Sequence, residues 1–421
     1  MAEITVTPEQ ESSFRWTMMA LCTLVMALGF IPMASFGVVA PAIAKSMHVS
    51  LSKVSLYGGD SFSTGIWAAF IPGHSGWFDK KPKVGVIIAS ALAIVPQFLL
   101  PVAGSLWFMT ILRFFQGFII MVLAIFAFQL SGWFRPSERG ISFGFTVGAI
   151  SLAGFLGGLL VNALAPLGWR ATDYISGLIM IVGLVLYLIF AKDAPTFMKG
   201  VLAAKEKESV HQSAWGWKMS WIMGLVQLPL VWVLFTTGGF MPLFAIKVGH
   251  YTAGQAGTLV LIWGLAGFVI SVLGSRYGDY LCKGKTTHRE VVNVRLKIII
   301  AGDILMGLAA VAYITIGHLG FGAMVFAVIL NSFMWLVPPN YWATPGNVYP
   351  LALMGAGAFV MGIVSNAGSP IGALVSSALL PGLGWNGVFI LMAAVSFAGI
   401  FICIWGMKSQ LPSEDPKYTA G

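Results

Sequence analysis

Arg113 is the one charged side chain in the apolar stretch from Leu106 to Trp133. A guanidinium keeps its charge inside a protein, so in a hydrocarbon environment it must face a partner, a water-filled cavity or both. Its planar set of N–H donors suits the oxygens of an anion. Gln116 follows three residues later and could add a neutral hydrogen bond. We therefore expect Arg113 and Gln116 to contact a negatively charged substrate.

Asp60 is the carboxylate expected beside Arg113. Counted from Lys53 and Ser105, both side chains lie at a matched depth of about 10 to 12 Å, at about 1.5 Å per helical residue. Burial makes an aspartate hold its proton more tightly, and an arginine partner has the opposite effect. Asp60 and Arg113 are thus predicted to form a coupling pair, in which an anion at Arg113 frees Asp60 for protonation. A permanent salt bridge is the structural alternative.

Other polar and aromatic side chains could reach the same substrate. The candidates are Asn366, Asn331, Trp335 and Tyr341. Asn366 is preferred because it lies in a glycine-rich setting, although each of these side chains could serve helix packing equally well. Asp303 is also expected inside the membrane and is assigned to structure.

The residue pattern gives no support to enzyme chemistry. It contains no phosphate-binding loop and no paired carboxylates on one helix face, and its histidines are isolated. Cys22, Cys282 and Cys403 are too few and too scattered for a metal site or a disulfide framework. We expect no enzymatic activity, no metal and no cofactor, and hence a process driven by a proton or other ion gradient.

The composition is typical of a polytopic membrane protein. Of 421 residues, 58% are hydrophobic and 9% are charged, against about 25% charged in soluble domains. The mean hydropathy is +0.87, and no Asp, Glu, Lys or Arg occurs from Ile304 to Met407. Most of the 24 Lys and Arg fall on one side of the predicted topology, which predicts a cytoplasmic (inner) membrane protein with both termini in the cytoplasm. The lipid bilayer is the expected partner, and nucleic acid is not.

The apolar segments divide into two similar halves. They predict twelve spans, at residues 16–42, 54–78, 84–133 (two spans divided at 101–105), 141–165, 169–191, 221–246, 256–277, 294 onward, 321–337, 354–380 and 385–407. Pro41 and Asp79 recur as Pro242 and Asp279, about 200 residues later, which indicates an internal repeat. The predicted domains are a cytoplasmic tail (1–15), a six-helix bundle (16–191), a cytoplasmic linker (192–218), a second six-helix bundle (219–407) and a cytoplasmic tail (408–421).

Charged side chains near the inner ends of the helices predict a conformational latch. Asp79 follows the second span with Lys80 beside it, Arg139 begins the fifth span, and Asp279 follows the eighth. An aspartate there can accept hydrogen bonds from a helix N-terminus or from an arginine of the other half. We expect these four residues to hold one conformation closed; a solvated charge cluster is the alternative.

The segment Arg113-Phe-Phe-Gln-Gly117 resembles the helix 4 motif of the major facilitator superfamily. Glu138-Arg-Gly140 resembles the start of helix 5 in that superfamily, and the segment from Ser75 to Lys83 resembles more loosely its loop between helices 2 and 3. The resemblance implies two pseudo-symmetric bundles with the substrate site between them near the midplane. Trp342-Ala-Thr-Pro345, with glycines around Asn366, looks like the anion:cation symporter branch, which implies organic anions carried with protons or sodium.

The sequence thus predicts an all-α polytopic membrane protein with the twelve-helix fold of that superfamily. The expected function is secondary active transport of a small organic anion, a carboxylate-type metabolite, by alternating access in proton-coupled symport, with the protein working as a monomer. Two alternatives remain. One is a proton-coupled antiporter that exports drugs or amphipathic compounds, favoured by the many Phe, Trp and Met side chains. The other is a membrane sensor or scaffold that keeps the fold without transport.

Overall fold

The computed structural model describes residues 7–207 and 213–415, and within these the regular secondary structure is helical. The helices of the first half are α1 (Phe14–Met47), α2 (Leu51–Val54), α3 (Ser61–Ala68), α4 (Pro82–Leu99), α5 (Leu106–Gln116), α6 (Met121–Trp133), α7 (Arg139–Leu164) and α8 (Gly168–Phe190). The linker carries α9 (Pro195–Lys207). The helices of the second half are α10 (Lys218–Lys247), α11 (Ala253–Cys282), α12 (His288–Thr315), α13 (Phe321–Ser332), α14 (Val337–Trp342), α15 (Pro345–Val348), α16 (Met354–Asn366) and α17 (Gly368–Lys408).

These helices fit the twelve predicted membrane crossings. In the described residues, 10 helical stretches are long and apolar enough to span a membrane by length and composition. The last of them, Met354–Glu414, counts as two crossings because Gly384 has a left-handed φ of 62° that breaks the helix. The remaining crossing consists of α2, the π-helical turn Ser55–Asp60 and α3, which follow one another without a gap.

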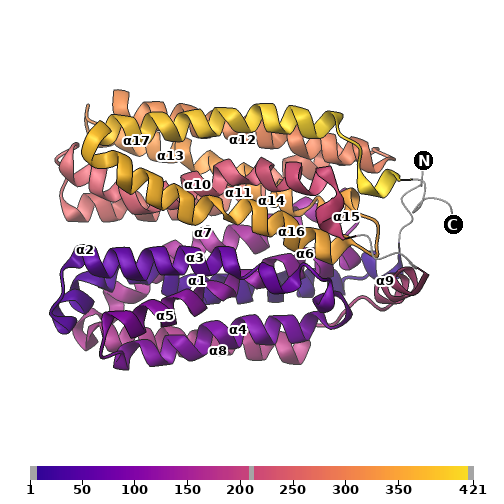
Figure 1. The fold of residues 1–421 in the computed structure, drawn as a ribbon, viewed down its shortest axis with the longest axis horizontal. Helices are drawn as coiled ribbons and strands as arrows, with labels where there is room; N and C mark the ends of the chain where they lie inside the picture. The colour runs from indigo at the N-terminus through magenta and orange to yellow at the C-terminus, as the bar shows by residue number, and fades with distance from the viewer. Residues whose placement is uncertain (1–6, 208–212, 416–421) are drawn as a thin grey trace.

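The two halves form two layers (Figure 1). In the first half α1 packs against α7 and α8, and in the second half α10 packs against α16 and α17. Between the halves, α7 packs against α11, and α3 packs against α16 and α17. The fifth crossing therefore meets the eighth, and the second meets the eleventh, as expected for a repeat related by a pseudo-two-fold axis. Both chain ends lie at the end of the molecule that carries α9 and α15, which we call the terminal end; the opposite one is the far end.

The second crossing ends earlier than the sequence predicted. We expected a helix from 54 to 78, but α3 ends at Ala68 and short 3-10 turns follow at Ile71–Gly73 and Trp77–Lys80. Pro72 lacks a backbone N–H and disfavours helical backbone at the residue before it, which explains the break. Asp79 consequently lies in a turn at the terminal end.

Glycines show which end of the interface between the halves is closed. On α7, a Cβ atom at Gly148 would lie 2.9 Å from the Ser271 hydroxyl oxygen of α11, and Gly144, nearer the terminal end, lies against Ser275. Toward the far end, glycines of four different crossings face open space: Gly37, Gly59, Gly154, Gly238 and Gly239. The halves are therefore packed together at the terminal end and open at these glycines toward the far end, although α7 and α11 stay in contact at Gly158, whose Cβ would lie 3.3 Å from Leu261.

Cysteine labelling can test this asymmetry in the purified protein. Gly154→Cys, on the part of α7 that faces open space, should react readily with a bulky maleimide. Ser271→Cys, a near-isosteric change in the packed interface, should stay protected, because Ser271 is fully buried. The background is expected to be low because Cys22, Cys282 and Cys403 are buried. Equal labelling of the two variants would contradict the assignment of open and closed ends.

Candidate functional site

A cavity lies between the two halves, and we call it the central cavity. Side chains from both halves line it: Phe30, Met33, Ile66, Ile120, Leu123, Val147, Ile150, Gln227, Leu230, Val231, Leu234, Phe235, Trp335, Pro338, Trp342 and Asn366. Most of the wall is apolar. The arrangement matches a small-molecule site, in which an apolar wall carries a few polar groups that orient the ligand.

Three polar atoms on this wall have no hydrogen-bond partner in the described part of the protein. They are Oε1 of Gln227, Nε1 of Trp335 and Nε1 of Trp342. A buried polar atom left unpaired costs about 1–3 kcal/mol, so such atoms are normally satisfied by water or ligand. All three atoms belong to side chains of the cavity wall but are shielded in this conformation, with Nε1 of Trp335 lying against Gly267, so an occupant reaches them only when these side chains turn.

The structure distributes the predicted substrate residues unevenly. Trp335 and Asn366 line the central cavity, and the Asn366 side-chain amide also donates to the Gly362 carbonyl at 3.0 Å. Asn331 and Tyr341 do not line it. The Asn331 side-chain oxygen accepts a hydrogen bond from Nε1 of Trp263 at 3.1 Å. The Tyr341 hydroxyl donates to the Met361 carbonyl at 3.2 Å. Both are fully buried among helices in this conformation, away from the cavity wall.

Sequence reasoning missed two polar members of the wall. Gln227 lies two residues before Pro229 in α10, and the broken character of that crossing was a signal that its polar side chains face a cavity. Trp342 was noticed only as part of a motif. No feature of the sequence distinguished it from tryptophans that anchor helices at a membrane surface.

Arg113 is buried, with 2% of its surface exposed. Its Nε donates to the Gly58 carbonyl at 3.2 Å, and its Nη1 donates to Oε1 of Gln116 at 2.7 Å. The guanidinium carbon lies 3.9 Å from the ring centroid of Phe36 and 4.6 Å from that of Phe62. These rings solvate the cation through their negative π faces.

Arg113 lies beside the central cavity but does not line it in this conformation. It precedes the cavity residue Ile120 by seven positions, about 10 Å along the fourth crossing, and the 3-10 turn Gly117–Ile120 lies between them. Phe36 is three residues from Met33, and Phe62 is four residues from Ile66; Met33 and Ile66 line the cavity. The two rings that cover the guanidinium are therefore each about one helical turn from a side chain of the cavity wall.

The predicted pair of Asp60 and Arg113 is not formed. Within the described residues neither side chain forms an ion pair, and Nε of Arg113 instead donates to the backbone carbonyl of Gly58. The π-helical turn Ser55–Asp60 changes the direction in which each side chain points, which depth alone could not predict.

A different acid is connected to Arg113. Nε2 of Gln116 donates to Oε1 of Gln97 at 2.6 Å. Nε2 of Gln97 then donates to the backbone oxygen of Asp173 at 3.0 Å and to its Oδ1 at 3.3 Å. Asp173 was missed in the sequence, although an acid five residues inside the sixth crossing is a signal for a functional residue.

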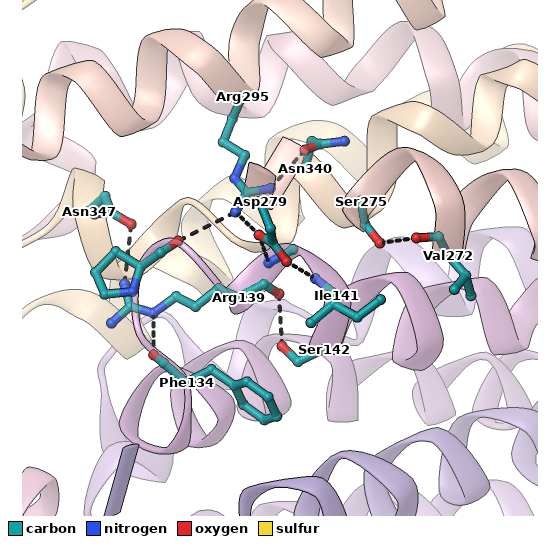
Figure 2. Close-up of polar contacts among 12 residues, drawn as sticks. Phe134, Arg139, Ile141, Ser142, Val272, Ser275, Asp279, Arg295, Asn340 and Asn347 are labelled. Atoms are coloured by element: carbon teal, nitrogen blue, oxygen red, sulfur yellow. Dashed lines mark hydrogen bonds and ion pairs between the residues drawn. The ribbon is translucent and has the colours of Figure 1, made fainter. Parts of the chain in front are cut away.

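The terminal end is closed by Asp279, which joins the two halves. Its carboxylate accepts hydrogen bonds from the backbone N–H groups of Gly140 at 2.9 Å and Ile141 at 2.6 Å, at the N-terminus of α7 (Figure 2). Arg295 forms an ion pair with the same carboxylate and donates to Oδ1 of Asn340 at 3.0 Å. A carboxylate at a helix N-terminus is favoured by the helix dipole and by the unpaired N–H groups.

Asp79 forms the equivalent contact in the other half. Its carboxylate lies at the N-terminus of α16, where it accepts from the backbone of Ala356, and it pairs with Nζ of Lys205 at 2.8 Å. Burial raises the pKa of the Asp79 carboxyl, and Lys205 opposes this rise. Lys80 was predicted as part of the latch, but it is exposed. Lys205 takes this role because α9 brings it back across the turn that holds Asp79.

Arg139 links the halves at the same end. Its Nη1 donates to Oδ1 of Asn347 in α15 at 3.1 Å, and its Nε donates to the Phe134 carbonyl at 3.2 Å (Figure 2). The structure thus brings Asp79, Arg139 and Asp279 to the closed interface. In each half, an aspartate at the terminal end of the second crossing meets the N-terminus of the fifth helix of the other half.

The two aspartates should differ in their contribution to stability. Removing one partner of a buried ion pair costs about 3–5 kcal/mol, because the other charge remains buried. Arg295 is 0% exposed, whereas the Lys205 side chain is 17% exposed and can turn to water. Asp279→Ala is therefore expected to lower the melting temperature clearly more than Asp79→Ala. Thermal unfolding of both variants in the same detergent checks this order, and the reverse order would refute it.

Comparisons with known proteins agree with this architecture. The chain is 24% identical over 387 residues to a probable sulfoacetate transporter of Cupriavidus necator, covering 87% of each chain. It is 22% identical over 426 residues to the hexuronate transporter of Escherichia coli, covering 95% of each, and 21% identical over 376 residues to a phosphoglycerate transporter protein of Salmonella typhimurium, covering 81% of this chain and 78% of that one.

A solved structure shares the fold. The crystal structure of a human organic anion transporter, TETRAN, superposes with a TM-score of 0.70 at 11% identity, over 94% of this chain and 100% of the other. The family model described as Major Facilitator Superfamily matches residues 19–373. The predicted fold and family are confirmed: the chain belongs to the Major Facilitator Superfamily.

Proposed function

We propose that this protein transports a small organic anion across the cytoplasmic membrane by alternating access, in symport with a proton. One observation carries the proposal. Arg113 is a buried cation without a carboxylate in direct contact, within residues 7–207 and 213–415, and the crossing that carries it also contributes Ile120 and Leu123 to the cavity between the two halves. Burying a charge inside a membrane protein costs free energy, so a buried charge is expected to bind a ligand or an ion.

The aromatic contacts of Arg113 suggest how an anion reaches it. The rings of Phe36 and Phe62 cover the guanidinium, and each is about one helical turn from a side chain of the cavity wall. When either ring rotates, the guanidinium gains access to an anion that enters from the far end. The unpaired N–H groups of Trp335 and Trp342 then supply further donors from the second half. An anion held between the halves would favour their approach.

The relatives support the chemical class of the substrate. The names of three of them refer to sulfoacetate, phosphoglycerate and hexuronate. These compounds share a small polar body with at least one oxyanion group, which is the group that an arginine binds best. We therefore extend the predicted carboxylate class to small oxyanions that include sulfonates and phosphates.

The state of the two ends supports alternating access. The latch at the terminal end holds the halves together while the far end is separated, which is one of the two states that such a cycle requires. The excess of Lys and Arg assigns the terminal end to the cytoplasm, so this state would admit substrate from outside. We propose import, in which substrate enters from this state.

A second candidate is export of an amphipathic compound in exchange for protons. The apolar and aromatic wall of the central cavity favours it. This candidate makes no use of Arg113 as a substrate ligand. A flux assay of Arg113 variants therefore distinguishes the two transport functions. It also tests the alternative of a sensor or scaffold that does not transport.

The flux assay uses the purified protein in liposomes with an acidic exterior and radiolabelled sulfoacetate, 3-phosphoglycerate or glucuronate. Arg113→Ala should reduce uptake at least about tenfold, because a charge-assisted hydrogen bond contributes about 1.5–3 kcal/mol. Arg113→Lys should retain part of the uptake, since it keeps the charge but loses the planar geometry. Lys45→Ala removes an exposed cation from the same end and is the matched control. Export of a cationic dye without anion uptake would favour the second candidate, and no flux of either compound would favour a sensor or scaffold.

The cavity wall makes a separate prediction. Gln227→Leu removes an unpaired acceptor and should raise the KM for the anion severalfold while the protein remains stable, because Leu has a similar volume and leaves no unpaired atom. Asn331→Leu is the comparison, because that side chain bonds to Trp263 away from the cavity. It should lower thermal stability more than Gln227→Leu does. A Gln227→Leu variant with unchanged KM would remove this residue from the site.

A further inference from the structure

The hydrogen bonds between Arg113 and Asp173 form a chain with one direction. Gln116 accepts from Arg113 with its side-chain oxygen and donates with its nitrogen to Gln97. Gln97 likewise accepts with its oxygen and donates with its nitrogen to Asp173. Both amide dipoles are therefore aligned between a cation and a carboxylate. Such a chain polarises its members and transmits a change at one end to the other.

All four side chains that form this hydrogen-bonded chain are buried within the first half. Their exposed fractions are 2% for Arg113, 3% for Gln116, 1% for Gln97 and 3% for Asp173. They come from three crossings, namely the third (α4), the fourth (α5) and the sixth (α8). Asp173 is five residues from the start of α8, which places it about 8 Å inside the far end.

Asp173 is equipped to bind a proton. Its Oδ1 accepts from Gln97, while its Oδ2 is buried without a partner in the described residues. Among the ionisable groups of the described residues on elements packed near α8, Arg113 is the one that interacts electrostatically with Asp173. Cys22 of α1 interacts with Asp193, Arg139 of α7 lies in the latch, and Lys45 of α1 is exposed.

The charges of the buried site must balance in each state. Without substrate, the cation of Arg113 and the carboxylate of Asp173 sum to zero. A monovalent anion at Arg113 leaves one uncompensated negative charge in a medium of low dielectric constant, which is costly. One proton on Asp173 restores neutrality.

We propose that Asp173 is the proton site coupled to anion binding at Arg113, through Gln116 and Gln97. This inference rests on the proposed function and assigns its coupling residue to Asp173 in place of Asp60. When an anion accepts the hydrogen bonds of Arg113, the chain loses its donor, and the Asp173 carboxylate loses its stabilisation. A proton from water at the far end then forms an O–H bond at Oδ2, and the same proton leaves when the anion leaves.

The coupling has a consequence for stoichiometry. One proton enters with one monovalent anion, so uptake of glucuronate should be electroneutral. Uptake of a divalent anion with one proton moves net charge. A potassium diffusion potential should therefore leave glucuronate uptake unchanged and alter the uptake of sulfoacetate.

A test without substrate measures the link between the two charges. Thermal unfolding of Arg113→Gln, Asp173→Asn and the double variant forms a double-mutant cycle. The double variant should melt higher than the sum of the single shifts predicts, because it leaves neither charge buried alone. The same cycle with Asp60→Asn should be additive within error. Additivity of the Asp173 cycle would overturn the inference.

A test with substrate measures proton uptake directly. The wild-type protein in weakly buffered detergent solution should take up about one proton per glucuronate bound, and its affinity should fall about tenfold per pH unit above neutrality, by linkage. Asp173→Asn should bind glucuronate with no pH dependence and no proton uptake. Asp193→Asn is the matched control, because Asp193 also accepts from a glutamine of the fourth crossing, Gln129, at 2.7 Å, but is not part of the chain to Arg113. This control should behave as the wild type does.

Two outcomes distinguish failure of this inference from failure of the proposed function. If glucuronate and sulfoacetate bind neither wild type nor variants, the anion function fails. If they bind in an Arg113-dependent way but Asp173→Asn keeps the pH dependence, the function stands and the coupling role fails. Gln97→Leu retains both charges and interrupts the chain, so it provides the same readout if Asp173→Asn does not fold. It should bind glucuronate with a weakened pH dependence.

Discussion

A permanent positive charge in an apolar interior must be solvated by the protein itself. In this structure the solvation of Arg113 comes from two aromatic faces, one backbone carbonyl and one side-chain amide, and none of these is a direct counter-ion. Neutral groups stabilise a cation without cancelling its charge, so the guanidinium retains its attraction for an anion. The local architecture follows from this requirement. The π-helical turn presents the Gly58 carbonyl, and α4 and α8 contribute Gln97 and Asp173 of the hydrogen-bonded chain.

The second constraint comes from the proposed transport cycle, in which the two halves separate and meet again while the helix ends at their interface keep hydrogen-bond partners. Asp79 and Asp279 meet it by symmetry, since each satisfies backbone N–H groups of a helix that belongs to the other half. The contact is strong while the halves touch, and water can replace it when they part. Aspartates at helix N-termini thus combine stability with reversibility. Packed apolar side chains alone would give no such exchange with water.

The sequence predicted the fold, the correspondence of Asp79 with Asp279 and the location of Arg113 inside the membrane-spanning part, because composition, repeat spacing and an isolated intramembrane charge are one-dimensional signals. It also pointed to Trp335 and Asn366, which line the cavity. It did not predict the partner of Arg113. Depth along a helix can be counted from residue numbers, but the direction around the axis depends on local geometry, here a π-helical turn before Asp60. Lys205 was unpredictable for a related reason, since the path of a linker is determined by tertiary contacts.

The glycines of the separated end have a mechanical consequence. Gly37, Gly154, Gly238 and Gly239 leave the facing helix surfaces smooth, with bare backbone where side chains would otherwise stand. Closing such surfaces immobilises few rotatable bonds, so little conformational entropy is lost when they touch. The smooth end can shut with a small thermodynamic penalty, whereas the opposite end is held by charges that must be rehydrated on opening. The two ends therefore differ in what limits their movement: conformational entropy opposes closing of the far end only weakly, and opening of the terminal end requires its charged groups to be rehydrated.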